Sequence, residues 1–181
     1  MRVNKGLMIA ATFDPTKRTS LITVADMCRK IEENSISLPL YQRDISWTLQ
    51  KCIDLLNYQL WGKAPVSPIS INVINTVDSA VPQVSFIDRE IISTIERGQY
   101  SVVDGQQRLT TNYKAYCNHD DFRNIVLDLG KGEFTEVRDS IRSNQIPVGI
   151  LLNKEDTKLF EYTKAKSALG SADVLSVLLQ V

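Results

Sequence analysis

The stretch that decides the fold of this chain is Tyr100-Ser-Val-Val-Asp-Gly-Gln-Gln-Arg-Leu-Thr-Thr111. Its first four residues predict an apolar strand, and residues 106–117 predict a helix. Asp104-Gly105 lies between the two as a turn signal. The first turn of a helix has backbone N–H groups without intrahelical partners, and they carry the positive end of the helix dipole. The stretch therefore predicts an anion site at a helix start, and a nucleotide phosphate is the anion we expect there.

The polar residues of this turn suit phosphate binding. Gly105 allows close approach to the backbone, and Arg108 lies one turn inside the helix, from where its guanidinium can reach back to an oxyanion. Asp104 would repel a phosphate unless a divalent cation, a sugar hydroxyl or a water lies between them. Gln106 and Gln107 are neutral amides that can orient a water or read a base. The alternative is an ordinary strand-to-helix turn in which Asp104 caps the helix.

A second polar cluster, Tyr41-Gln42-Arg43, follows a short extended segment at residues 36–40 that contains Pro39. Arg43 supplies a second cation for a polyphosphate, and the rings of Tyr41 and Trp47 offer aromatic faces for a base. The alternative for both rings is a place in the hydrophobic core. Two arginine-bearing clusters at the ends of extended segments are difficult to explain by packing, so together they predict a nucleotide pocket.

Hydrophobic periodicity, caps and turn residues predict the other elements. Helices are expected at residues 20–34, 49–61, 90–96 (a short turn), 156–166 and 173–180. Extended segments are expected at residues 69–74 (half-buried), 84–87, 124–129, 133–137 and 146–152. Thr23 is the expected N-cap of the first helix, either Ser46 or Thr48 caps the second, and Gly62 follows the second helix. Residues 124–137 are expected to form a hairpin.

Length and composition indicate one globular domain with appendages. The chain has 181 residues, 43% of them hydrophobic, which is enough for one sizeable core. We expect an N-terminal arm at residues 1–19, the domain itself at 20–155, and a helical appendage at 156–181. The formal net charge is zero, so no overall field attracts nucleic acid or an anionic membrane.

Cysteine and histidine usage argue against a metal centre or a disulfide framework. The three cysteines are widely spaced, which favours reduced thiols, and His119 is the one histidine in the sequence. No metal ligands are therefore assigned. The short apolar run near the N-terminus does not match a secretory signal, and no segment has the length of a membrane span. We expect a cytoplasmic protein without a membrane partner.

Three segments resemble one known family when they are taken in order along the chain. They are Leu38-Pro-Leu-Tyr-Gln-Arg-Asp-Ile-Ser-Trp47, Pro68-Ile-Ser-Ile71 and Val102-Val-Asp-Gly-Gln-Gln-Arg-Leu-Thr-Thr111. This pattern is similar to the N-terminal domain of GmrSD-type restriction enzymes, which also occurs in SspE-like phage-defence proteins and belongs to the ParB/sulfiredoxin superfamily. The resemblance covers roughly residues 36–155 and implies an α/β (α+β) fold, with a small mixed sheet and flanking helices.

The resemblance also implies an activity. The family's Asp-Gly-Gln-Gln-Arg motif implies that residues 104–108 bind and hydrolyse a nucleoside triphosphate, a reaction that can use Mg²⁺. Carried over by position, the catalytic residues would be Asp104, Gln106, Gln107 and Arg108. The nucleotide-binding residues would be Tyr41, Gln42, Arg43, Gly105 and Arg108. Thr110 and Thr111 match the pattern too, and we expect them to serve the helix and its packing.

One departure from the family limits the activity. Family members often continue into an HNH-type nuclease domain rich in histidine, whereas this chain has one histidine. We therefore expect an NTPase that is not itself an HNH nuclease, that works with a separate nuclease subunit or domain, and that meets DNA through that complex. Two alternatives stay open: a switch or adaptor that binds nucleotide or modified DNA without turnover, and a ParB-like nuclease acting alone.

Overall fold

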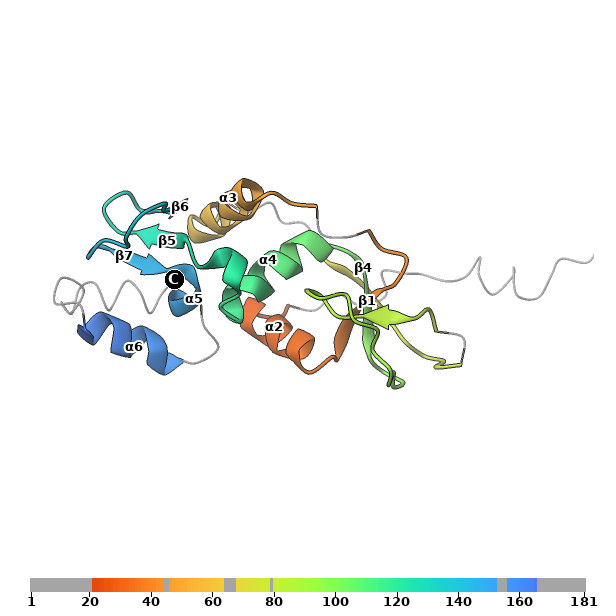
Figure 1. Ribbon diagram of the computed structural model, residues 1–181. Helices are drawn as coiled ribbons and strands as arrows, with labels where there is room; N and C mark the ends of the chain where they lie inside the picture. Colours follow the sequence, from red (N-terminus) through yellow and green to blue (C-terminus); the bar gives the residue numbers. More distant parts are fainter. Residues whose placement is uncertain (1–20, 44–45, 64–67, 79, 153–155, 166–181) are drawn as a thin grey trace, which may run out of the picture.

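The computed structural model describes residues 21–43, 46–63, 68–78, 80–152 and 156–165. Figure 1 shows two small sheets on either side of a central helix, α4. The helices of the described residues are α2 (Val24–Glu32), α3 (Leu49–Leu60), α4 (Gln106–Tyr116), α5 (Val148–Leu151), α6 (Asp156–Ala165) and the short 3-10 helix η1 (Asp120–Phe122). The strands are β1 (Ile36–Pro39), β2 (Ser70–Val73), β3 (Gln83–Val84), β4 (Tyr100–Asp104), β5 (Ile125–Asp128), β6 (Glu133–Glu136) and β7 (Gln145–Pro147). The predicted α/β class is confirmed.

The first sheet is mixed and has the strand order β2-β4-β1-β3. Strands β1 and β4 are parallel neighbours, with Ile36 opposite Tyr100 and Ser37 opposite Ser101. The other two pairings in this sheet are antiparallel. The second sheet is antiparallel with the order β6-β5-β7, and β5 and β6 form the predicted hairpin. The parallel pair matters for the site, because it brings the C-terminal ends of β1 and β4 to one edge.

Helix α4 links two hydrophobic cores. Leu109, in its first half, packs with residues of α2, β1, β3 and β4. Ala115, near its end, packs with residues of α3 and the second sheet. Residues on both faces of the helix are therefore buried, including the hydroxyl-bearing Thr110 and Thr111. With α2 and α3 also packed against it (Figure 1), the N-terminus of α4 has a fixed position relative to both sheets.

The predicted helix boundaries are largely confirmed by observed caps. The amide of Asp26 donates to Oγ1 of Thr23 at 3.0 Å at the start of α2. Thr48, the second of the two proposed caps, accepts from the amide of Lys51 at the start of α3. Gly62 follows that helix with a φ of +60°, which glycine adopts without strain.

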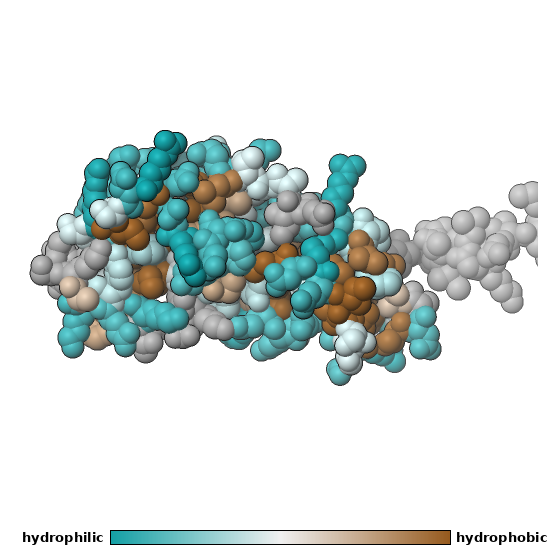
Figure 2. All heavy atoms as spheres, viewed as in Figure 1, coloured by the Kyte–Doolittle hydropathy of each residue, from teal (hydrophilic) through white to brown (hydrophobic). Residues whose placement is uncertain are grey.

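The predicted strand at residues 69–74 is present, but its predicted burial is found only at the two ends, where Ile69 is half-buried and Ile74 is buried. All four residues of β2, which is an edge strand, are exposed. Ile71 is 37% exposed and Val73 48%. Figure 2 shows hydrophobic surface, in brown, at the end of the molecule that carries this sheet. Alternation of apolar and polar residues predicts a strand, but it does not show whether other elements of the fold cover its apolar face.

Two other predictions also need correction. Residues 90–96 form no helix; instead Ile91 pairs with Val84 as an isolated bridge. Residues 146–152 are not extended throughout, because β7 ends at Pro147 and helix α5 follows. Proline fits the start of a helix, where its missing N–H would have no partner. The expected arm at residues 1–19 and helix at 173–180 lie outside the described residues.

Candidate functional site

The predicted strand-turn-helix at Asp104-Gly105 is present. Strand β4 ends at Asp104, and Gly105 is the N-cap of α4 with φ +97° and ψ 7°. A Cβ atom at this glycine would lie 3.0 Å from Cγ1 of Ile69 and 3.3 Å from Nη2 of Arg108. Both the backbone conformation and the surroundings therefore favour glycine. No side chain caps this helix within the described residues, so the alternative in which Asp104 is the cap is not observed.

The two predicted clusters meet in one cleft of about 510 Å³. They meet because β1 and β4 are parallel neighbours, so the residues that follow the two strands lie at the same edge of the sheet. The cleft is lined by Tyr41, Gln42, Arg43, Trp47, Val103, Asp104, Gly105, Gln106, Gln107 and Arg108. Every residue assigned to the site from the sequence is in this lining, and the volume is typical of a small-molecule site.

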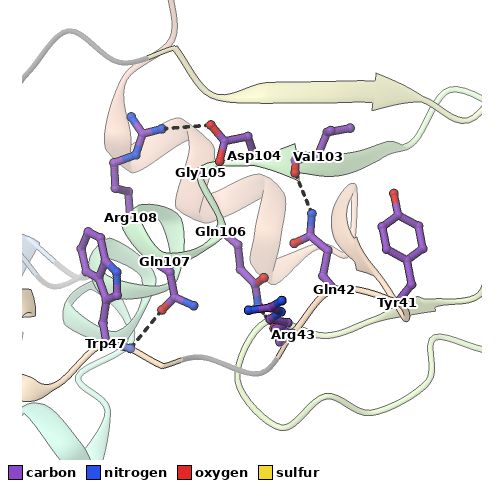
Figure 3. A pocket seen from close by; sticks show the side chains of 10 residues that line it. All are labelled: Tyr41, Gln42, Arg43, Trp47, Val103, Asp104, Gly105, Gln106, Gln107 and Arg108. Atoms are coloured by element: carbon purple, nitrogen blue, oxygen red, sulfur yellow. Dashed lines mark hydrogen bonds and ion pairs between the residues drawn. The ribbon is translucent and has the colours of Figure 1, made fainter.

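The side chain of Gln42 completes the end of the sheet. Its Nε2 donates to the carbonyl oxygens of Val102 at 2.7 Å and Val103 at 2.8 Å. Strand β1 pairs with β4 only at the two positions given above and then turns away at Pro39. The amide of Gln42 thus takes the place of a strand neighbour for the last carbonyls of β4 and fixes the Tyr41-Gln42-Arg43 segment against the motif (Figure 3).

The two glutamines of the motif hold the opposite wall of the cleft. Nε2 of Gln106, which is buried, donates to the carbonyl of Arg43 at 3.1 Å. Oε1 of Gln107 accepts from the backbone N–H of Trp47 at 3.3 Å. The other polar atom of each amide, Oε1 of Gln106 and Nε2 of Gln107, takes no part in these two hydrogen bonds and can contact a ligand. The glutamines therefore fasten the start and the end of the 43–47 segment to helix α4.

The charges of the cleft are two cations and one carboxylate. Nη2 of Arg108 donates to the carbonyl of Pro68 at 3.2 Å and lies 3.9 Å from Oδ2 of Asp104. The side chain of Asp104 is 75% exposed and that of Arg108 is 21% exposed. Arg43 is exposed. Figure 3 shows Arg108 and Trp47 on one side of the motif and Tyr41 on the other, with Gln42, Arg43 and Gln106 between them.

The two threonines of the motif point to packing, as predicted. Thr110 and Thr111 are 1% and 2% exposed, and Oγ1 of Thr111 donates to the carbonyl of Gln107 at 2.9 Å. The sequence did not identify Val103, whose carbonyl anchors Gln42, or Arg89, which contacts the same wall from a distant loop. A backbone carbonyl leaves no signal in a sequence, and an arginine in a polar loop resembles any solvated charge.

The number of acidic side chains limits how this site could hold a metal ion. In the ranges that the structure describes, no group of three or more His, Cys, Asp and Glu side chains is arranged to hold a metal. Among the described residues that line the cleft, Asp104 is the one carboxylate. A cation bound there would need further oxygen ligands from a bound molecule or from water. This arrangement fits Mg²⁺, which commonly combines one or two carboxylates with substrate phosphates.

The fold and the cleft define a class: an α/β domain with a polar cleft at a glycine-initiated helix, next to a parallel strand pair. Residues 24–174 match the family model of the GmrSD restriction endonuclease, N-terminal domain. Because the match spans most of the chain, the protein belongs to this family, and it is a domain of a modification-dependent restriction system. Family membership implies association with a restriction nuclease module. A comparison with curated proteins gave no match. Among the described helices, none has the length and apolar character needed to cross a membrane.

Proposed function

We propose that the cleft binds a nucleoside triphosphate and hydrolyses it, and that this reaction controls a nuclease module that acts on modified DNA. One observation carries the proposal: Arg43 and Arg108 both line the single cleft at the glycine-initiated start of α4. A helix start and two guanidiniums form a strong site for a polyphosphate. The family supplies the context of restriction.

In this proposal the terminal phosphates lie at the start of α4. The backbone N–H groups of its first turn point toward them, and Arg108 and Arg43 neutralise their charge. Asp104 would hold Mg²⁺, and the bound ion would offset the negative charge of the phosphates. Oε1 of Gln106 and Nε2 of Gln107 face the ligand as neutral groups. Tyr41, exposed at the rim, offers a face for the base.

The decisive measurement is a calorimetric titration of the protein with ATP, GTP, CTP and UTP, each with and without Mg²⁺. We expect binding of at least one nucleotide, and Mg²⁺-dependent release of inorganic phosphate from it. Replacing Arg108 with alanine removes a charge-assisted contact of about 1.5–3 kcal/mol, so the Kd should rise roughly 10- to 100-fold. Arg43→Ala should act in the same direction without disturbing the core, since Arg43 is exposed.

A matched control is Arg97→Ala. Arg97 is an exposed arginine outside the cleft, so the change removes the same charge and should leave the Kd unchanged. If no nucleotide gives heat or raises the melting temperature of the wild-type protein, the proposed function is wrong. Equal weakening by Arg97→Ala and Arg108→Ala would mean that overall charge, rather than the cleft, determines binding.

A second candidate function is nucleotide binding without turnover, in an adaptor or switch. One observation favours it: both motif glutamines spend one amide atom on backbone contacts with residues 43–47. A neutral amide is a poor base, so among the described residues of the lining Asp104 is the one carboxylate able to take a proton from an attacking water. Tight binding combined with no phosphate release above the Asp104→Asn variant would support the adaptor over the enzyme.

A further inference from the structure

The loop after β3 reaches the wall of the cleft that carries Tyr41-Gln42-Arg43, although it lies far from that wall in sequence. Strand β3 continues into a hairpin closed by two backbone hydrogen bonds, Ser85 N–H to Glu90 O at 2.9 Å and Ile92 N–H to Gln83 O at 2.9 Å, which together form the Val84–Ile91 bridge. Arg89 lies in the turn of this hairpin. Its φ is +58°, in the left-handed region that non-glycine residues seldom adopt.

The guanidinium of Arg89 contacts the turn that carries the second site cluster. Its Nη2 donates to the carbonyl of Gln42 at 2.7 Å and to that of Leu40 at 3.3 Å. The same turn is closed by the N–H of Gln42 donating to the carbonyl of Pro39 at 3.0 Å. The Nη1 atom of Arg89 is shielded from solvent. A planar guanidinium can serve two carbonyls of one turn at once, which a lysine ammonium does less well.

The contacts of Arg89 lead directly to the ligand side of the cleft. Gln42 is held through its backbone by Arg89, and its side chain is bonded to the last carbonyls of β4. Tyr41 and Arg43, the residues on either side of it, line the cleft. A charge-assisted hydrogen bond at the Gln42 carbonyl therefore sets the position of the whole Tyr41-Gln42-Arg43 wall. A backbone held in a rarely populated region is a recurrent property of such supporting residues.

We infer that Arg89 is a positioning residue of the cleft: it does not touch the ligand, and it holds the Tyr41-Gln42-Arg43 wall in the geometry that binds the ligand. The inference rests on the proposed function for the identity of the ligand. It assigns a role in the site to the loop after β3. It also predicts that loss of the guanidinium loosens this wall even when no ligand is present.

Two substitutions separate the guanidinium from the backbone conformation. Arg89→Gly removes the side chain but suits a φ of +58°, whereas Arg89→Ala removes the side chain and keeps the unfavourable φ. Arg89→Gly should therefore melt at a higher temperature than Arg89→Ala. Both should nevertheless bind nucleotide about 10-fold or more weakly than the wild type, because a contact of this kind is worth roughly that factor. Arg89→Lys should lie between them and the wild type.

The first readout needs no ligand. Amide hydrogen exchange of Gln42, whose N–H is bonded to Pro39, should accelerate in the order wild type, Arg89→Lys, Arg89→Gly. The amide of Leu109, bonded to Gly105 within α4, should keep its wild-type rate and so exclude global unfolding. Unchanged exchange at Gln42 in Arg89→Gly, or any other order of the variants, overturns the inference whether or not the wild type binds a nucleotide.

The second readout is nucleotide affinity, with Arg97→Ala as the control in the same connecting segment. Weaker binding by Arg89→Gly in proportion to the faster Gln42 exchange supports the inference. Wild-type affinity in Arg89→Gly overturns it and leaves the proposed function intact. Absence of binding by the wild type overturns the proposed function, while the exchange rates still decide whether Arg89 positions this wall.

Discussion

Two glycines with nearly the same φ allow a controlled test of the site. Gly105 has a φ of +97° and Gly98 a φ of +96°. A Cβ atom at Gly98 would meet nothing within 4 Å, whereas one at Gly105 would meet Ile69 at 3.0 Å and Arg108 at 3.3 Å. Gly98→Ala therefore measures the cost of the conformation, and Gly105→Ala measures that cost plus the close contact at the start of α4.

The expected magnitudes follow from these surroundings. An alanine held at such a φ costs about 1–3 kcal/mol, so both variants should lose stability by roughly this amount. The Cβ at Gly105 must also displace Ile69 or the guanidinium of Arg108, which adds about 1 kcal/mol or more. Gly105→Ala should also weaken nucleotide binding, because Arg108 would move and the helix start would be obstructed. Gly98→Ala should leave the Kd at its wild-type value.

The assay is urea unfolding of the three proteins, followed by circular dichroism, with the midpoints compared at a shared slope. The fitted slopes must agree for that comparison to hold. Equal loss of stability in the two variants would refute the claim that the surroundings of Gly105 are tight. Wild-type stability in Gly98→Ala would refute the claim that the positive φ is costly there.

Three other predictions concern residues outside the cleft. Oγ1 of Thr110 is buried and has no hydrogen-bond partner in the described part of the chain, so Thr110→Val should raise the free energy of unfolding by about 0.5–1.5 kcal/mol. Thr111→Val loses a 2.9 Å hydrogen bond to a carbonyl one turn back and should lower the free energy of unfolding by a similar amount. Urea unfolding measures both changes, and changes of the same sign in the two variants would contradict the assignment. The hydrogen bond from Gln145, together with backbone N–H donors, lowers the pKa of the buried Asp128 carboxyl. This carboxylate therefore stabilises the fold above its ordinary pKa of about 4, and the stabilisation is lost as the pH falls through the lower pKa of the folded state. The stability difference between the wild type and Asp128→Asn should therefore be present at pH 7 and shrink below about pH 4, and a difference that grows in acid would contradict this sign. Burial raises the pKa of the Cys28 thiol to about 12, so iodoacetamide at pH 8 should leave Cys28 unmodified in the folded protein and label it in urea, as read by mass spectrometry; rapid labelling of the folded protein would show that the thiol is accessible.

The sequence predicted the elements that depend on local rules. Thr23 and Thr48 are found as caps, and the strand, turn and helix at residues 100–116 are present, because caps, glycine turns and helical periodicity act within a few residues. The predicted burial failed along residues 70–73 and the predicted helical turn at residues 90–96 is absent, because burial and strand pairing depend on distant neighbours. Edge position and an isolated bridge have no local signal, so alternation alone was misleading there.

The candidate site shows the same division. The sequence by itself identified the Asp-Gly-Gln-Gln-Arg turn at residues 104–108 and its need for glycine, since a positive φ next to a helix start is a property of a few consecutive residues. The sequence also predicted that residues 41–43 and this turn share a pocket, but only the tertiary structure decided how the two segments meet across one cleft. The physical reason is the parallel pairing of β1 with β4, which places the ends of two strands more than 60 residues apart at a common edge. The same structure showed that Arg89 and the motif glutamines hold the walls of that cleft, through backbone carbonyls and amides that carry no side-chain signal in the sequence.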